Sequence, residues 1–274
     1  MMEGMVYSFS KLFTSVQCNL TYSCLKFRFS TAPLDPEAIR PYLTALIQTY
    51  LSTMEIIGVE TWIMHGTLLA WWWNQKVQSR GFSPQQIFMN DLLIVTILLQ
   101  IFPWDSDLDV QVSEPTIHFL ANYYNMTEHH YDLPGVVGSR NYLLEVNPNY
   151  VVRSPADREN VIDARWIDTG TGLFIDITAL RQDDANRNIN NVKGAMMCKD
   201  GHRYNVCAST TYMYLVIADS SQEMEIFPLR NSHFENSRVK IPYDYTKVLR
   251  KEYGPKSMTT LIYGKYVFCA ICIW

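Results

Sequence analysis

The stretch Pro103–Glu114, PWDSDLDVQVSE, carries the residues whose types and spacing most directly suggest chemistry. Asp105, Asp107 and Asp109 stand at every second position, and an apolar–polar alternation typical of a β-strand follows them. Because successive side chains of a strand point to opposite faces, we expect the three carboxylates on one face. Carboxylates this close repel one another unless a cation lies among them. The pattern favours a metal site, and a solvated acidic turn before a strand is the alternative.

A further aspartate stands in a segment where a charge is costly. The run Leu173–Leu180 is almost wholly apolar except for Asp176, and the turn Thr169-Gly170-Thr171-Gly172 before it predicts a β-hairpin. A carboxylate inside a buried strand requires an ionic partner or a metal. A strand with Asp-x-Asp beside a strand with one more Asp would assemble a two-metal phosphoryl-transfer site, since Mg²⁺ prefers oxygen ligands.

A possible phosphate-binding turn lies upstream of the carboxylates. A short β-rich run, Thr61–Met64, meets His65-Gly66-Thr67, and an apolar helix is expected to begin at Leu68. A strand, a glycine turn and a helix start form a recurring phosphate cradle, because free N–H groups and the helix dipole favour an anion. The alternative is a tight turn in which Thr67 caps the helix.

The elements that position these residues follow from hydrophobic spacing. We expect a helix from Asp35 to Gly58, a second helix over the residues EPTIHFLANYYN, and a β-meander over RNYLLEVNPNYVV and NVIDARWIDTGTGLFIDITAL. The net charge of −4 and the absence of a basic run disfavour a nucleic-acid partner. The longest apolar run, Leu92–Phe102, is too short to span a bilayer. Cys269 and Cys272 form the only CxxC pair, and nothing at zinc spacing accompanies it.

Three motifs together resemble the LicD/fukutin family of the nucleotidyltransferase superfamily. The first is His65-Gly66-Thr67-Leu68-Leu69, the second is Pro103-Trp104-Asp105-Ser106-Asp107-Leu108-Asp109, and the third is Phe174-Ile175-Asp176-Ile177. The resemblance covers most of residues 38–256 and is closest to fungal LicD-type proteins of mannosylphosphate transfer. It implies an α+β fold with a nucleotidyltransferase-like mixed β-sheet flanked by helices.

The resemblance also implies a function. It implies that a phosphate-linked group, mannosylphosphate in the fungal relatives, passes from a GDP- or CDP-type nucleotide-diphosphate donor to a glycan hydroxyl with Mg²⁺ or Mn²⁺. Carried onto this chain, Asp107 and Asp109 hold the metal and Asp176 completes the site and serves as general base. Asp105 is a further candidate ligand. His65, Gly66 and Thr67 are the donor-phosphate residues.

The resemblance leaves an alternative open and implies a location. A non-catalytic regulator could keep the fold and assist a separate glycosyltransferase as its partner. A structural Ca²⁺ module is disfavoured because EF-hand spacing is absent after Asp105. The relatives are typically Golgi membrane proteins with a luminal substrate, whereas no anchor or signal peptide is evident in this chain.

The chain departs from the family pattern at residues 77–100, at residues 206–222 and in the tail. Both internal segments begin with Val and end with Gln, whose codons can supply the first and last letters of an intron. We therefore interpret them as introns translated in frame, and the tail from residue 264 similarly; genuine loop insertion is the alternative. The expected organisation is a poorly defined segment 1–34, a LicD-type domain 35–256 and an aberrant tail 257–274.

Overall fold

The structure is a computed structural model. It describes residues 6–7, 38–78, 101–102, 105–134, 137–152, 161–183, 195–198, 202–205, 224–259, 262–263 and 266–267. Nearly all of the segments 1–34 and 77–100, the whole of 206–222 and most of the tail lie outside these ranges. The interpretation of the internal segments as translated introns, and the domain boundaries drawn around them, stay predictions.

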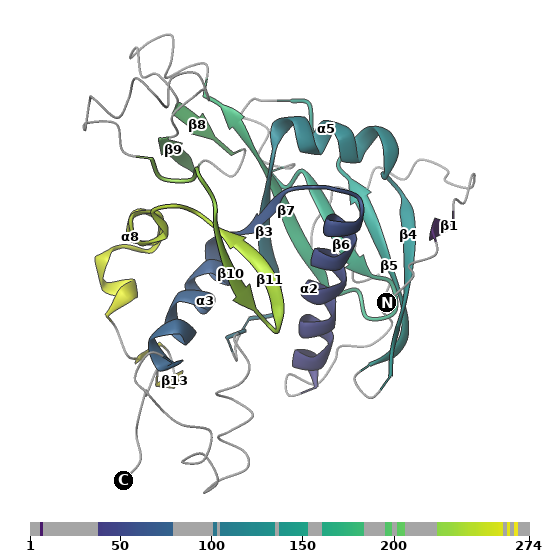
Figure 1. The fold of residues 1–274 in the computed structure, drawn as a ribbon, viewed down its shortest axis with the longest axis horizontal. Coiled ribbons are helices and arrows are strands. Elements are labelled where there is room, and N and C mark those ends of the chain that lie inside the picture. The colour runs from purple at the N-terminus through teal and green to yellow at the C-terminus, as the bar shows by residue number, and fades with distance from the viewer. Residues whose placement is uncertain are drawn as a thin grey trace, which may run out of the picture.

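A mixed β-sheet forms the centre of the fold and bears out the expected α+β class (Figure 1). Nine strands of the described residues belong to it, and the order along its main path is β1-β4-β5-β6-β7-β3-β2. Their bounds are β1 Val6–Tyr7, β2 Thr61–Ile63, β3 Leu108–Ser113, β4 Thr127–Leu133, β5 Gly138–Val146, β6 Ala164–Asp168, β7 Phe174–Gln182, β8 Ala195–Met197 and β9 Arg203–Asn205. Only β3 and β7 pair in parallel among these strands, and every other described pairing is antiparallel.

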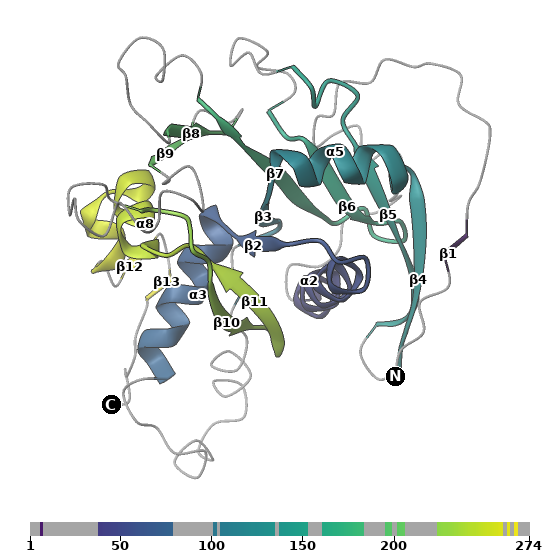
Figure 2. The same cartoon turned by 45° about the horizontal axis from the view of Figure 1, so that its top comes forward.

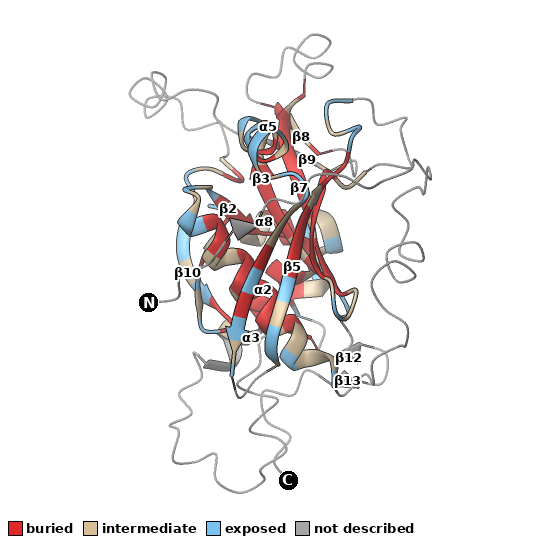
Figure 3. Cartoon of the chain, turned by 90° about the vertical axis from the view of Figure 1, so that its right-hand side faces the viewer, coloured by how far each residue is buried: buried red, intermediate tan, exposed pale blue. Residues whose placement is uncertain are grey.

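Helices and two small hairpins flank this sheet. In Figure 2, helix α2 is seen nearly end-on beneath strands β5–β7, and α5 lies above them. Strands β3 and β7 carry mostly buried residues (Figure 3). The flanking elements are α2 Ile39–Ile56, α3 His65–Gln78, α5 Glu114–Tyr123, α8 Tyr245–Tyr253, the 3₁₀ turn η2 Pro255–Met258, and the strands β10 Arg230–Phe234, β11 Ser237–Ile241, β12 Ile262–Tyr263 and β13 Tyr266–Val267.

The predicted helix upstream of Gly58 is confirmed as α2. Its residues at helical spacing, among them Leu43, Leu46, Ile47 and Tyr50, are fully buried, which gives the helix an apolar face against the sheet. Gly58 has a φ of 72°, and only glycine takes up this left-handed conformation at the helix end without strain.

Helix α2 packs on a pair of aromatic side chains of the sheet. The ring of Trp166 on β6 lies edge-on to that of Tyr50 with centroids 6.2 Å apart, and it stacks on Tyr142 of β5 at 5.7 Å. Aromatic pairs in these geometries add stability beyond the area that they bury. They fix α2 over the middle of the sheet.

The other local predictions hold with small shifts in their boundaries. The strand at Thr61 is β2, the helix after the carboxylates is α5, and the β-meander is β5–β6–β7 with its hairpin at residues 169–172. Ser113 begins α5 by accepting a hydrogen bond from the Thr116 N–H at 3.4 Å. Helix α3 begins at His65 and not at Leu68, because the Leu68 N–H already donates to the Met64 carbonyl at 3.0 Å.

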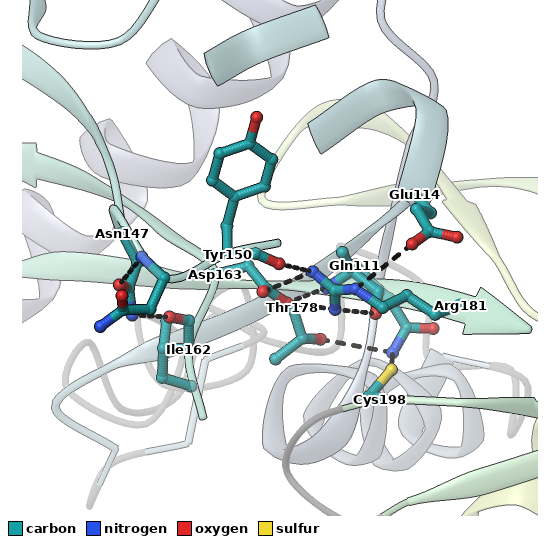
Figure 4. Close-up of polar contacts among 11 residues, drawn as sticks. Gln111, Glu114, Asn147, Tyr150, Ile162, Asp163, Thr178, Arg181 and Cys198 are labelled. Carbon is teal, nitrogen blue, oxygen red and sulfur yellow. Dashed lines mark hydrogen bonds and ion pairs between the residues drawn. The ribbon is translucent and has the colours of Figure 1, made fainter. Parts of the chain in front are cut away.

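A buried ion pair fixes the far half of β7 (Figure 4). Both carboxylate oxygens of Asp163 accept from the guanidinium of Arg181, at 2.6 and 2.9 Å, and these two side chains are almost fully buried. Arg181 also donates to the carbonyls of Tyr150 and Ala179, and Glu114 approaches it to 3.8 Å. Bidentate pairing with further hydrogen bonds is the condition under which buried charges are tolerated. The network ties β7 to the loop before β6 and to the start of α5.

No helix in the described part of the chain combines the length and the apolarity that a bilayer crossing requires.

A His129→Gln variant is expected to lose less stability in acid than the wild type. Burial beside Trp166 lowers the pKa of His129 from 6.5 to about 4. Between these values only the unfolded chain binds the proton, so the folded state loses stability as the pH falls through this window. The effect is at most about 3 kcal/mol.

Urea unfolding at several pH values between about 7 and 4.5 measures the difference. The exposed His233→Gln on β10 is the matched control and should follow the wild type. An equal pH dependence in the wild type and His129→Gln would contradict the assignment.

Candidate functional site

Strand pairing brings two of the predicted carboxylates together. Asp109 on β3 and Asp176 on β7 are register partners in the parallel pair, so their side chains leave the same face of the sheet. Adjacent strands lie about 4.8 Å apart, which allows two opposed carboxylates to share a cation. The expectation that all three upstream aspartates lie on a strand is wrong in part. Strand β3 begins only at Leu108, so Asp105 and Asp107 belong to the irregular segment before it.

Asp107 still lies near the pair. Burial is the main cause that raises the pKa values of Asp105, Asp109 and Asp176, and the charge of Asp107 raises each of them further. The segment before β3 therefore places its carboxylates beside the strand face, although it does not continue the strand.

The turn at residues 65–67 holds the backbone of Asp109 from both sides. The Met64 N–H donates to the Asp109 carbonyl at 3.2 Å, and the Asp109 N–H donates to the Thr67 hydroxyl oxygen at 2.8 Å. A β-carbon added to Gly66 would lie 3.5 Å from Oδ2 of Asp109. The glycine therefore leaves room beside this carboxylate at the N-terminus of α3, where the helix dipole favours an anion.

An arginine that the sequence analysis did not single out completes the cluster. Arg165 on β6 is the antiparallel register partner of Asp176, and its Nε donates to Asp176 Oδ1 at 2.6 Å. The guanidinium lies over the ring of Phe174 at 4.4 Å, a cation–π contact that holds it in place. The signal was present, because Arg165 is a charge among the apolar residues Ala164, Trp166 and Ile167 of β6 and needs a partner for the same reason as Asp176.

The cluster carries more negative charge than its own cations offset. Burial raises the pKa of Asp109 to about 7; the His65 charge acts against this shift, and Asp107, Asp176 and Glu252 add to it. Burial and then Asp107 raise the pKa of Asp105 to about 7. Burial also raises the pKa of Asp176, against the opposing effect of Arg165. Carboxylates with these shifts attract a cation.

Oxygen donors of this kind fit Mg²⁺ or Mn²⁺. These ions take carboxylate oxygens and complete their coordination with water and substrate phosphates. Asp107, Asp109 and Asp176 supply the carboxylates, with Asp105 close by. Their assignment as ligands stays a prediction, as do the roles of Gly66 and Thr67 toward a donor phosphate.

His65 has partners of its own outside the carboxylate cluster. Its Nδ1 lies 2.6 Å from Oε1 of Glu252, at the end of α8, and its ring lies 4.9 Å from that of His202. The predicted contact of His65 with a donor phosphate is not tested by this arrangement. The sequence analysis assigned no role to His202 or Glu252, and 187 residues separate His65 from Glu252.

A hollow of about 320 Å³ lies elsewhere, at the β6–β7 turn. Its lining includes Arg140 and Asp168, which form an ion pair at 2.8 Å. Asp168 is three positions from Arg165 on β6, so its side chain leaves the opposite face of the sheet. This hollow is therefore separate from the carboxylate cluster.

Two yeast proteins are similar to this chain. It is 30% identical over 159 residues to "Mannosyltransferase regulator 4" of Saccharomyces cerevisiae, which is 58% of this chain and 11% of that protein. It is 30% identical over 146 residues to "Mannosyltransferase regulator 14" of the same yeast, which is 53% of this chain and 13% of that protein. The chain therefore spans only a small part of the relatives that it matches. No protein-family model matches the chain.

Arg165→Met is expected to destabilise the metal-free protein by up to about 3 kcal/mol, because it leaves the largely shielded carboxylate of Asp176 without its ionic partner. Asp176→Asn should destabilise the fold as well. The double variant Arg165→Met/Asp176→Asn should lose clearly less stability than the sum of the two, since neither charge is then left alone. Urea unfolding of the four proteins measures the coupling.

Arg238→Met on β11 is the matched control, because Arg238 is exposed, and its effect should stay within about 0.5 kcal/mol. Strictly additive losses would show that Arg165 and Asp176 do not stabilise one another.

Proposed function

We propose that this chain transfers a phosphate-linked sugar, mannosylphosphate, from a nucleotide-diphosphate donor to a glycan hydroxyl. The observation that carries the proposal is the register of β3 with β7, which places Asp109 opposite Asp176 beside the His65-Gly66-Thr67 turn. The similarity to yeast mannosyltransferase regulators supports a place in mannosylation. The motif resemblance to the LicD/fukutin family supports the reaction class and a secretory-pathway location.

In this proposal the carboxylates bind the metal ion and the turn binds the donor phosphate. Asp107, Asp109 and Asp176 would hold Mg²⁺ or Mn²⁺, which would offset the charge of the donor phosphates when bound. The N-terminus of α3 at Gly66 would receive the phosphate nearest the sugar, through backbone N–H groups and the helix dipole. Thr67 keeps Asp109 in place through the 2.8 Å hydrogen bond from the Asp109 N–H.

The transfer step is then a displacement at phosphorus. The glycan hydroxyl oxygen bonds to the phosphorus that carries the sugar, and the bond from that phosphorus to the bridging oxygen breaks. The leaving group is the nucleoside monophosphate, and Asp176 takes the hydroxyl proton as general base. Arg165 orients Asp176 by its 2.6 Å hydrogen bond and favours the ionised form against the opposing effect of burial.

A second candidate function is regulation without catalysis. The printed names of both relatives call them regulators, and Arg165 already compensates the charge of Asp176 as a metal would. In that case the chain would keep the donor-binding face and act through a partner glycosyltransferase.

Asp109→Asn and Asp176→Asn are each expected to abolish the transfer of phosphate to glycan, because the loss of one carboxylate removes a ligand or the base. The purified chain is incubated with Mg²⁺, a GDP- or CDP-linked sugar donor and mannan, and the phosphate on the glycan is counted. Asp132→Asn, an exposed aspartate on β4, is the matched control and should retain wild-type transfer. Transfer at wild-type levels in both site variants would refute the catalytic proposal and favour the regulatory one.

Gly66→Ala is expected to weaken donor binding without unfolding the protein. The added methyl group would lie 3.5 Å from Asp109 Oδ2, an ordinary contact that the fold tolerates, but it would fill the space proposed for a phosphate. A thermal-shift panel of GDP- and CDP-linked donors with Mg²⁺ measures the effect. The apparent Kd for the stabilising donor should rise by about tenfold or more, which corresponds to about 1.4 kcal/mol.

Gly170→Ala is not a suitable control, because its β-carbon would lie 2.6 Å from the Arg140 side chain. Gly138→Ala at the start of β5 is the matched control, because a β-carbon there meets no other atom within 4 Å. Its φ of 74° strains an alanine and will lower the Tm. The two variants are therefore compared by their donor Kd and not by their Tm. An unchanged donor Kd in Gly66→Ala would remove the turn from the donor site.

A further inference from the structure

Three side chains from distant segments converge next to the carboxylate cluster. His65 is the first residue of α3, His202 immediately precedes β9, and Glu252 lies in the last turn of α8. One ligand atom from each lies within 4.8 Å of the other two. Nδ1 of His65 is 2.6 Å, and Nε2 of His202 is 3.6 Å, from the same Oε1 of Glu252.

Glu252 is more deeply buried than its hydrogen bonds explain. Its side chain is 8% exposed, and Oε2 is buried with no hydrogen-bond partner in the described part of the chain. A buried carboxylate oxygen without a partner is costly. The two imidazoles lie near Oε1 only, so Oε2 is left without a hydrogen bond in the described residues.

The spacing and the donor types suit a transition metal. Zn²⁺ binds imidazole nitrogen and carboxylate oxygen at about 2.0–2.2 Å, which places its ligand atoms about 3–4 Å from one another. The observed distances, 2.6 and 3.6 Å to Oε1 of Glu252 and at most 4.8 Å between any two of the ligand atoms, span this range, so small side-chain shifts would complete the site. Imidazole donors favour Zn²⁺ and its neighbours in the first transition row over Mg²⁺, so this cluster differs in chemistry from the all-carboxylate one.

We propose that His65, His202 and Glu252 form a second metal site that takes Zn²⁺ or a similar divalent transition-metal ion. Two histidines and one carboxylate leave at least one coordination position open, as in metal sites that bind water or a substrate oxygen. His202, whose side chain is 37% exposed, provides the side from which the ion enters.

The surrounding fold supports the geometry of the three ligands. Helix α8 is anchored by Lys247 and Lys251, which both lie 3.4 Å from Glu225, and Lys251 also donates to the Arg203 carbonyl at 2.6 Å. This contact holds the end of α8 beside β9, and hence Glu252 beside His202. A bound ion would fasten α8 to the start of α3 and place positive charge near Asp109, on which His65 and Glu252 already act electrostatically.

Cobalt substitution tests the site without any assay of transfer. The full chain is stripped of metal with a chelator and titrated with Co²⁺, whose visible absorption is strong in four- or five-coordinate nitrogen-containing sites and weak in six-coordinate oxygen sites. The wild type should show the strong bands with one equivalent of Co²⁺, and Zn²⁺ should displace them. His202→Ala and Glu252→Gln should weaken this binding by at least tenfold, since changes outside the ligand shell already weaken metal sites by about 10–100-fold.

Two further variants separate the possible sources of the signal. Asp109→Asn should keep the strong bands, because it alters only the carboxylate cluster, and His233→Ala on the exposed face of β10 is the matched histidine control. Only weak absorption in the wild type would overturn the proposal without reference to any variant. Strong bands that vanish in Asp109→Asn and persist in His202→Ala would also overturn it. Neither result bears on transfer, so the failure of this site and the failure of the proposed function are distinguishable.

Discussion

The parallel pairing of β3 with β7 brings two carboxylates together, and the arrangement of the neighbouring elements depends on how their repulsion is offset. The register places Asp109 opposite Asp176 on one face of the sheet, where both side chains are largely shielded from water and two like charges repel each other. The protein supplies part of the compensation. Arg165 pairs with Asp176 from the next strand, and the first residues of α3 bring His65 and the helix dipole near Asp109. Burial, and then the charges of Asp107, Asp176 and Glu252, still raise the pKa of Asp109 to about 7, against the opposing effect of His65.

Local patterns in the sequence predicted α2, α5 and the strands β5–β7, and they singled out the aspartates of the candidate site. The helical spacing of Leu43, Leu46 and Ile47 predicted α2, and the cost of a charge in an apolar strand pointed to Asp176. The start of β3 was placed too early, because alternation of charged and apolar residues does not distinguish a strand from the extended segment that leads into it. Arg165 was overlooked although the same reasoning applied to it. Its pairing with Asp176 follows from the antiparallel register of β6 with β7, and the predicted hairpin already implied that register.

The cluster of His65, His202 and Glu252 could not be predicted from local sequence patterns. His65 and Glu252 are 187 residues apart, and α8 is short and rich in charged residues, so no periodicity connects it with the turn before α3. Their contact depends on long-range packing. Trp71 of α3 donates to Ser232 of β10 at 2.8 Å and its ring meets that of Tyr245, the first residue of α8, at 5.0 Å. Only the assembled fold shows that the residue assigned to a phosphate from its motif also faces a carboxylate from the far end of the chain.

His65 therefore belongs to two clusters at once, and its backbone has an unusual conformation. Its φ of 50° lies in the left-handed region, which is uncommon for a residue with a β-carbon and costs on the order of 1–3 kcal/mol. The hydrogen bonds that fix Met64 and Thr67 to the two sides of Asp109 hold the chain in this conformation. A glycine at position 65 would relieve the strain, but it would remove the imidazole that meets Glu252. In this left-handed conformation, the peptide group of His65 lies beside the carboxylate cluster while its side chain reaches Glu252.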